Sequence, residues 1–209
     1  MLNPDVTYWF PLRIRHSSVP RLMTLKDYLD REEGILETYV PMEYRTENYH
    51  TELVPVINNI IFVRCTYNTL KALRQNQTRY EPLRYIMHFV SDGKTSMPEV
   101  MYVPDTMMQT FIRVTKDKQD NVIFLDNLEF ACKPGTKVCI TDGVYTGVVG
   151  VVKHIKKNLC VVVAIEGVAA AAIMYVPRKH LRYLKEEEER MSEGEHKPSL
   201  SKQAAVATT

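Results

Sequence analysis

The sequence predicts an α+β protein of two units: helices packed on an antiparallel sheet over residues 6–118, and a small SH3-like β-barrel over residues 133–184. In the first half, apolar runs of strand length alternate with stretches in which the apolar residues recur at helical spacing. Four of the eight glycines fall between positions 135 and 150, among short runs of Val and Ile. Residues 119–132, which contain three acidic and no basic side chains, are interpreted as a linker.

The first unit is expected to begin with an aromatic strand, Tyr8–His16, in which Pro11 indicates a sheet edge or a bulge. Leucines at helical spacing from position 22 to 29 predict a helix that Gly34 ends. The segment Leu53–Thr66 is the most apolar of this half and predicts a central strand. The remaining elements follow in order: extended segments at 36–44 and 85–90, a polar helix at 67–79, and an amphipathic helix after Pro104.

The second unit has short Val- and Ile-rich runs, glycine corners and no long helix, a pattern typical of a strongly bent barrel. Asp142 and Gly143 are expected to form a turn, because glycine tolerates positive φ. Tyr145 should then project into solvent, and Gly147 should permit a close backbone approach. Residues 185–209 are acidic at first and then rich in small residues, which predicts an acidic and then disordered tail.

Composition limits the function classes. The chain has 209 residues, 45% of them hydrophobic, and a formal net charge of +2, as expected of a soluble globular protein. No apolar run reaches bilayer length and no secretory signal is visible, so a cytoplasmic monomer without membrane contact is expected. Nine basic and two acidic residues in 133–185 indicate a nucleic acid or an acidic protein as partner, although a solvated lysine surface explains them equally well.

Catalytic motifs are not found. The sequence has no Walker loop, no GxSxG and no GxGxxG after a strand, its histidines are scattered, and its four cysteines form no CxxC pair. We therefore expect no catalytic residues, no metal site, no cofactor and no enzymatic activity.

Two stretches carry a family resemblance. PGTKVCITDGVYTGVVGVVKHI at 134–155, followed by CVVVAIEGVAAAAIMYVPRKHL at 160–181, resembles the C-terminal KOW domain of NusG transcription elongation factors. An aromatic strand with Trp9 and Phe10, the strand VPVINNIIFVR and the helix VPDTMMQTFIRV resemble the N-terminal NGN domain of that family. The combination is most similar to UpxY-type antiterminators of capsular polysaccharide operons. It implies an NGN domain at 6–118, a linker at 119–132, a KOW domain at 133–184 and a tail at 185–209.

The resemblance implies an antitermination or elongation factor whose NGN domain docks an apolar depression onto the coiled coil of the RNA polymerase clamp and suppresses pausing or termination. The residues that match this role are Phe10, Ile57, Ile60, Phe62, Met108, Phe111 and Ile112. Non-template DNA or nascent RNA would be contacted from the polar helix, by Lys71, Arg74, Gln75 and Arg79. The KOW domain would bind Rho or a small-subunit ribosomal protein through the turn of Asp142, Gly143, Tyr145 and Gly147.

Alternatives remain for each assignment. The apolar residues could be ordinary core, and the polar helix could be a solvated face. A KOW-type RNA-binding or ribosome-associated protein is the second function considered. It would require a basic excess throughout the chain, whereas residues 1–118 carry 15 basic and 14 acidic side chains. An enzyme is the third.

Overall fold

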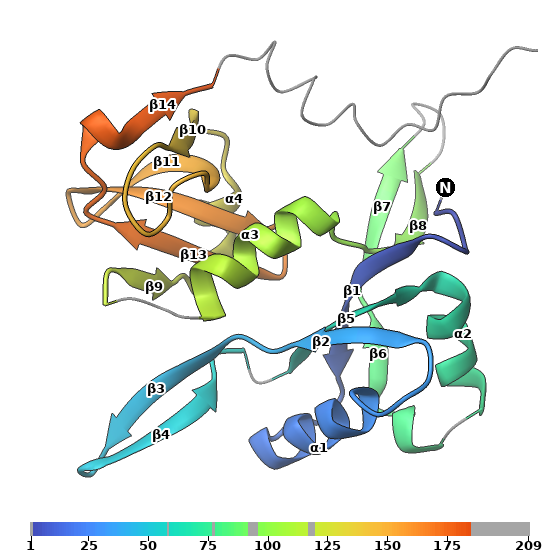
Figure 1. Cartoon of the computed structure of the whole chain (residues 1–209). Helices are drawn as coiled ribbons and strands as arrows, with labels where there is room; N and C mark the ends of the chain where they lie inside the picture. The colour runs from blue at the N-terminus through green and yellow to red at the C-terminus, as the bar shows by residue number, and fades with distance from the viewer. Residues whose placement is uncertain (1, 58, 77, 92–95, 117–119, 185–209) are drawn as a thin grey trace, which may run out of the picture.

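The structure is a computed structural model that describes residues 2–57, 59–76, 78–91, 96–116 and 120–184. It contains helices and antiparallel sheets, with a four-stranded sheet in the first half of the chain and a six-stranded sheet in the second (Figure 1). The mixed class expected from the sequence is therefore observed. Within the described residues, none of the helices combines the length and the apolar character that a bilayer crossing requires.

The N-terminal sheet has the order β2-β5-β1-β6, and all its pairs are antiparallel. Its strands are β1 (Thr7–Ile14), β2 (Ile35–Tyr39), β5 (Ile60–Thr66) and β6 (Leu83–Tyr85). The prediction of an edge or bulge at Pro11 is wrong, because β1 lies between β5 and β6. Pro11 is tolerated there because β6 pairs only with residues Leu12–Ile14, so the position without an N–H lies just outside that ladder.

Two helices cover one face of this sheet. They are α1 (Val19–Leu29) and α2 (Tyr67–Asn76), and the short 3-10 turn η1 (Thr78–Tyr80) follows α2. Ser18 caps α1 by accepting a hydrogen bond from the Arg21 amide, and the leucines of both helices pack on Leu12, Ile61 and Val63 of the strands. The strand β5 lies inside the sheet, as predicted for a central strand, but it covers only Ile60–Thr66 of the predicted segment Leu53–Thr66.

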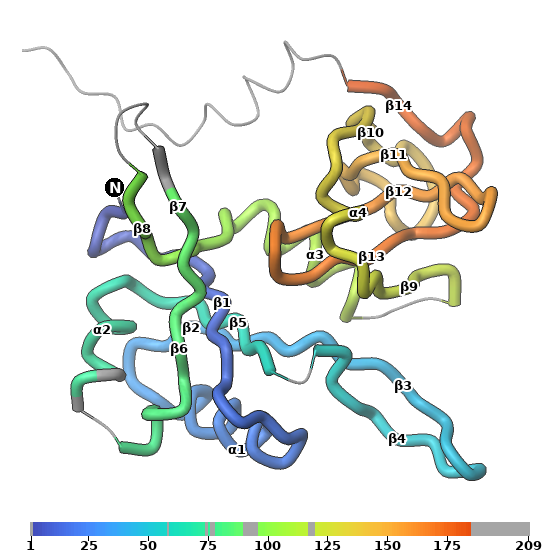
Figure 2. Tube along the Cα trace, turned by 180° about the vertical axis from the view of Figure 1, so that it is seen from behind, coloured from blue at the N-terminus to red at the C-terminus, as the bar shows by residue number. Residues whose placement is uncertain are grey.

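Two hairpins extend the first half. One consists of β3 (Met42–Glu47) and β4 (His50–Pro55), and it projects away from the rest of the chain in both views (Figures 1 and 2). The other consists of β7 (Met87–Ser91) and β8 (Ser96–Val100). The predicted extended segments 36–44 and 85–90 are thus each divided between two strands. Val103 then pairs with Trp9 of β1 and leads into α3 (Asp105–Lys116).

The C-terminal sheet has the order β14-β10-β11-β12-β13-β9 and no pairing between its first and last strands in the described residues. Its main strands are β10 (Lys137–Ile140), β11 (Val149–Ile155), β12 (Asn158–Ile165) and β13 (Ala169–Met174). β14 (Leu181–Tyr183) follows the short turn η2 (Arg178–His180). The closed barrel expected from the sequence is not found, because β9 pairs with the outer edge of β13 and the sheet stays open.

The segment predicted as a linker contributes structure to the second unit. It contains β9 (Val122–Phe124), which pairs with β13, and α4 (Leu128–Cys132), which packs on β12 and β13. Asn127 caps α4 by accepting a hydrogen bond from the Phe130 amide. Residues 122–132 are thus attached to the C-terminal sheet. The predicted tail, 185–209, lies outside the described residues.

The backbone of Gly150 in β11 lies very close to β12. A Cβ atom at this position would lie 2.6 Å from Cγ1 of Val161 and 2.7 Å from the carbonyl oxygen of Val162. A backbone oxygen cannot move aside as the end of a flexible side chain can, so β11 and β12 must separate to admit a methyl group.

We predict that Gly150→Ala lowers the free energy of unfolding by about 3 kcal/mol, near the upper end of overpacking costs. The matched control is Gly143→Ala. Gly143 has φ +90° but nothing within 4 Å of a Cβ, so only left-handed strain of about 1 kcal/mol applies. Urea unfolding of both variants measures the difference. Equal losses would contradict the close packing of β11 on β12.

The buried thiols should be unreactive. Burial raises the pKa of Cys65 to about 12 and also raises the pKa of Cys160, whereas Cys132 and Cys139 are partly exposed. We expect a disulfide reagent at pH 8 to modify Cys132 and Cys139 and to spare the other two until the protein unfolds. Because the folded-state pKa of Cys65 exceeds its unfolded value of about 9, its contribution to stability is complete below pH 9 and is lost as pH rises toward 12. Rapid modification of all four thiols in the folded protein would contradict this core.

Candidate protein-binding site

An apolar cluster forms where α3 lies against β5. Ile60 and Phe62 of β5 face α3, and the rings of Phe62 and Phe111 lie 6.1 Å apart between centroids. Met108, Phe111 and Ile112 recur at helical spacing on α3, so their side chains share one stripe of the helix. The structure therefore brings together five of the seven residues for which the resemblance implies a docking role. We call this group, Ile60, Phe62, Met108, Phe111 and Ile112, the α3 face.

The α3 face is covered by the C-terminal sheet. All five of its side chains are buried, and they belong to the same core as valines and isoleucines of β10, β12 and β13. Figures 1 and 2 show α3 lying between the two sheets. In this arrangement the face is part of a core shared by both units, which agrees with the alternative noted from the sequence that these residues serve as core.

Tyr145 belongs to the same core. The prediction that this ring projects into solvent is wrong, since Tyr145 is only 6% exposed and lies in the buried cluster that contains the α3 face. The turn itself forms as expected, with φ +90° at Gly143 and φ +86° at Gly147. Gly147 supplies this left-handed conformation, and a Cβ there would meet nothing closer than Nη1 of Arg113 at 3.8 Å. The close approach expected at Gly147 occurs at Gly150.

Polar contacts surround the shared core. Arg113 of α3 donates a hydrogen bond of 3.1 Å from Nη2 to the carbonyl oxygen of Val144, beside the Tyr145 turn. The hydroxyls of Tyr39 and Thr115 lie 2.6 Å apart, which joins the end of β2 to the last turn of α3. Asp142 in the turn contacts Nε2 of His180 at 3.4 Å. These contacts give the apolar core a polar rim.

The start of α3 is fixed to the N-terminal sheet. Asp105 accepts a hydrogen bond of 3.0 Å from Nε1 of Trp9 and pairs with Nε of Arg64 at 3.2 Å. Asp105 also places a negative charge in the first turn of the helix, where the helix dipole favours it. Sequence reasoning missed Asp105 and Arg64 as positioning residues, although an acidic residue directly after Pro104 is a helix-start signal.

Of the two remaining residues, Phe10 lies elsewhere and Ile57 lies beside the α3 face. The side chain of Phe10 is on the opposite face of the sheet, in the core under α1 and α2, because strand alternation turns its neighbour Trp9 toward α3. The structure thus does not bring Phe10 to the α3 face. Ile57 is partly buried and packs at the margin of the shared core.

The residues predicted to contact nucleic acid do not form one group. Lys71 and Gln75 are exposed on α2, and Nζ of Lys71 lies 5.6 Å from the centroid of the Tyr67 ring. The side chain of Arg74 lies outside the described part of the structure. Arg79 belongs to η1, and its guanidinium lies 5.1 Å from the centroid of the Tyr28 ring of α1.

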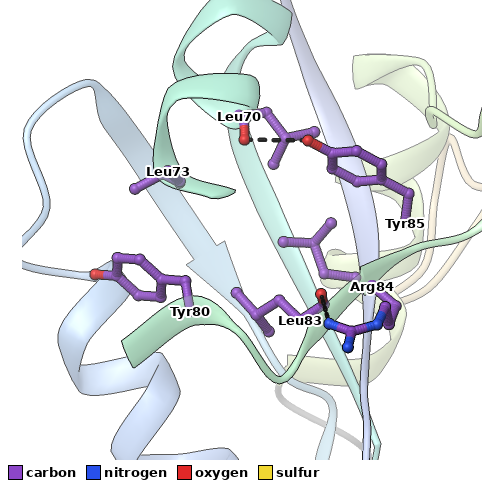
Figure 3. Close-up of a pocket in the computed structure, with 7 residues that line it drawn as sticks. Leu70, Leu73, Tyr80, Leu83, Arg84 and Tyr85 are labelled. Atoms are coloured by element: carbon purple, nitrogen blue, oxygen red, sulfur yellow. Dashed lines mark hydrogen bonds between the residues drawn. The ribbon is translucent and has the colours of Figure 1, made fainter. Parts of the chain in front are cut away.

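A small cavity lies between α2 and β6 (Figure 3). Its volume is about 10 Å³, and it is lined mainly by Leu12, Leu70, Leu73, Tyr80 and Leu83. The Tyr85 hydroxyl donates to the Leu70 carbonyl beside it. Such a volume admits one water molecule at most, so this is a packing defect and not a ligand site. Among the residues described, no three His, Cys, Asp or Glu side chains gather closely enough to hold a metal ion.

Comparisons with known proteins give similarity among solved structures. No protein-family model matches the chain, and no curated protein matches it. Among solved structures, it is similar to NusG of Thermotoga maritima, described as "Domain interaction in Thermotoga maritima NusG", with a TM-score of 0.38 and 16% sequence identity. The match covers 88% of this chain and 100% of that one. With so low a TM-score, the function has to be argued from the chain's own residues.

Proposed function

We propose that the chain is a transcription elongation or antitermination factor that binds RNA polymerase through the α3 face and suppresses pausing or termination. The observation that carries the proposal is the gathering of five large apolar side chains from β5 and α3 on one surface of the N-terminal unit. The second unit supplies the cover of that surface. The motif resemblance supplies the partner, the coiled coil of the polymerase clamp.

A helical partner suits this surface chemically. A surface with aromatic and aliphatic side chains at its centre and polar groups at its rim has the composition of a protein-binding hot spot. The centre is Phe62, Phe111 and Met108, and the rim includes Tyr39. An amphipathic helix would replace the apolar contacts that β12 and β13 make with α3 in the packed arrangement.

Binding through the α3 face requires the C-terminal unit to move. A fully buried apolar side chain of this size contributes about 1.5–3 kcal/mol, so the face stays covered until an apolar partner takes the place of the sheet. Tyr145 lies in the same core. The same movement would therefore uncover the turn proposed to bind Rho or a small-subunit ribosomal protein, and the two contacts would become available together.

The finer aspects of the proposal come from the sequence. Action at capsular polysaccharide operons and contact with non-template DNA or nascent RNA are taken from the resemblance. A cytoplasmic location and a monomeric state are taken from the composition, and the absence of catalysis and cofactors from the missing motifs. Exposure of Lys71 and Gln75 supports a nucleic-acid contact on α2.

A KOW-type RNA-binding or ribosome-associated protein is the second candidate. Exposed Lys156 and Lys157 at the β11–β12 turn, and exposed Arg178 and Lys179 on η2, favour it. Lys153 is not available to an RNA partner, because its Nζ is bonded to the backbone carbonyls of Lys133 and Pro134. Capture of polymerase or of ribosomes by the purified chain separates the two candidates.

Two adjacent residues of α3 should change polymerase affinity in opposite directions. Arg113→Ala removes the hydrogen bond to Val144 and leaves the α3 face intact. The packed arrangement should lose about 1 kcal/mol of stability relative to the uncovered one. Because the face is then uncovered more often, polymerase binding should tighten about fivefold. Ile112→Asp places a carboxylate in the face and should weaken binding at least tenfold. Biolayer interferometry on immobilised core RNA polymerase measures both affinities.

The control for these variants is Arg45→Ala, which removes an exposed arginine from the β3–β4 hairpin and should leave affinity unchanged. Circular dichroism and thermal unfolding establish that each variant is folded. If the α3 face served only as core, the two α3 variants would either both weaken polymerase binding or both leave it unchanged. That result, or a wild-type chain that does not bind polymerase, would overturn the proposal.

Transcription through a pause site tests the activity itself. With saturating wild-type protein, purified polymerase should spend less time at the pause and read further through a terminator, whereas Ile112→Asp at the same concentration should leave both unchanged. Pause lifetimes are measured by gel analysis of radiolabelled transcripts. An equal effect of the two proteins would show that any activity does not depend on the α3 face.

A further inference from the structure

The β3–β4 hairpin, residues 42–55, has two chemically different faces. It projects from the rest of the chain, and residues 44–53 are all exposed (Figures 1 and 2). We call this hairpin the arm. Side-chain alternation along its paired strands places only hydroxyl and apolar groups on one side, which we call the uncharged face: Tyr44, Thr46, Thr51 and Leu53. The other side carries every charged or titratable residue of the two strands: Glu43, Arg45, Glu47, His50 and Glu52.

The uncharged face has the pattern of a strand pair that is covered on one side. Antiparallel strands alternate in this way when one face is packed and the other is solvated. Tyr44 and Leu53 lie directly opposite each other and are 78% and 51% exposed. Met42, on the same face, packs at the margin of the core under α1. The uncharged face is therefore turned to the α1 side of the N-terminal sheet, and its outer part is open to solvent.

The arm ends in a strained turn that presents an aromatic ring. Glu47 pairs with His50, so the loop consists of Asn48 and Tyr49 alone, with φ +50° and +64°. Two positive φ values are those of a type I′ turn, whose second position is ordinarily glycine. Tyr49 occupies this position and is fully exposed. A bulky residue held in the left-handed region at the outermost point of the arm indicates that the ring itself makes a contact.

An open cleft lies on the same side of the sheet. Its volume is about 440 Å³, and its walls come from one side of α1 and from η1 with the residues after it. Leu25 and the ring of Tyr28, a residue that is 39% exposed, give the cleft an apolar part, and Arg21 lines it as well. An apolar recess with a cationic neighbour suits an aromatic side chain that is flanked by a carboxylate.

Charges around the cleft complement those of the arm. A hydrogen bond of 2.9 Å from Arg84, and then the charges of Arg84, Arg15 and Arg21, lower the pKa of Glu81. When Glu81 is counted against Arg84, two of these three arginines remain in excess.

A second carboxylate, Glu32, stands beside Arg79. Both groups act on the Tyr80 hydroxyl, which donates a hydrogen bond of 2.8 Å to Glu32. When Glu32 is counted against Arg79, the excess positive charge lies with Arg15 and Arg21. The arm has three glutamates and one arginine, so it carries the opposite charge.

We propose that two copies of the chain exchange their arms and form a dimer. The uncharged face of each arm lies against the α1 side of the other copy, the Tyr49 ring enters the cleft of that copy, and Glu47 lies near Arg21. The arm and the cleft belong to one side of the same sheet. A two-fold axis therefore makes both contacts twice, and the assembly closes as a dimer.

The extent of the contact favours exchange over simple stacking of two arms. The face of a pair of six-residue strands measures only about 20 Å by about 10 Å, whereas a stable interface takes about 800 Å² from each partner. In an exchange, each copy contributes ten exposed residues of its arm and the eight residues that line its cleft. Together they approach the about 20 to 30 residues a side of a standard interface.

A contact at this lower limit is reversible. We expect a dissociation constant on the order of 10 µM. The chain is then a monomer in dilute solution, as the composition predicts, and a dimer at higher concentration.

The dimer goes beyond the proposed function and does not rest on it. The arm and the cleft belong to the α1 side of the sheet, whereas the α3 face belongs to the other side. A chain that dimerises but does not bind polymerase would overturn the proposed function alone. A chain that binds polymerase but stays monomeric would overturn the dimer alone.

Sedimentation equilibrium of the full chain from about 1 to about 100 µM, tenfold on each side of the expected constant, tests the proposal. The wild type should pass from monomer to dimer. Tyr49→Gly removes the ring and places the favoured residue in the turn, so the dimer should weaken at least tenfold while thermal stability stays equal or rises. The matched control is Tyr175→Gly. Tyr175 is also exposed, at 68%, with φ +60°, but it lies in the C-terminal unit, so its loss should leave the dimer unchanged.

Exchange of two charges tests the pairing of Glu47 with Arg21. Glu47→Arg and Arg21→Glu should each weaken the dimer about fivefold, because each brings like charges together at both contacts. The two changes in one chain should restore the wild-type affinity. Circular dichroism establishes that each variant is folded.

Three results would overturn the proposal. A wild type that stays monomeric over the whole range would leave the arm to a different protein. Equal effects of Tyr49→Gly and Tyr175→Gly would place the dimer contact elsewhere. A doubly changed chain that dimerises no better than the single variants would exclude the pairing of Glu47 with Arg21 on which the exchange is built.

Discussion

The rest of the structure depends on the burial of α3 on both of its sides. The helix packs on β5 through Phe62 and Phe111, and its remaining apolar surface lies against β12 and β13. The apolar side chains of α3 therefore pack against both sheets. Asp105, held by Trp9 and Arg64, fixes the start of the helix to the first sheet, so the C-terminal sheet is the side that can part from α3 without dismantling the N-terminal core.

The N-terminal sheet separates two kinds of surface. Strand alternation along β1 and β5 turns Trp9, Ile60 and Phe62 toward α3 and turns Phe10 and Ile61 toward α1 and α2. The α3 side presents apolar side chains, which suit a protein partner. The α1 side carries arginines at its surface.

Elements with a strong hydrophobic periodicity were predictable from the sequence, whereas contacts between residues far apart in the sequence were not. The 3.6-residue repeat of Met108, Phe111 and Ile112 identified α3, and the positive φ of Gly143 followed from its turn. The strand β9 could not be recognised, because three residues become a strand only by pairing with β13. That pairing also explains why the expected barrel is an open sheet. Likewise, nothing local to the turn indicates that Tyr145 is buried in the core that contains the α3 face, and nothing near Tyr28 indicates that Arg79 stacks on it.

Sharing one core between two proposed contacts has a thermodynamic consequence. The C-terminal sheet and any partner of the α3 face compete for the same apolar side chains, so the observed affinity for the partner equals its affinity for the uncovered face multiplied by the fraction of molecules in which the face is uncovered. Contacts such as Arg113 with Val144 change that fraction without touching the partner. Specificity can then reside in whatever shifts the balance toward the uncovered form. A second ligand would shift it only if it bound the two forms with different affinity, because a ligand with equal affinity for both changes nothing.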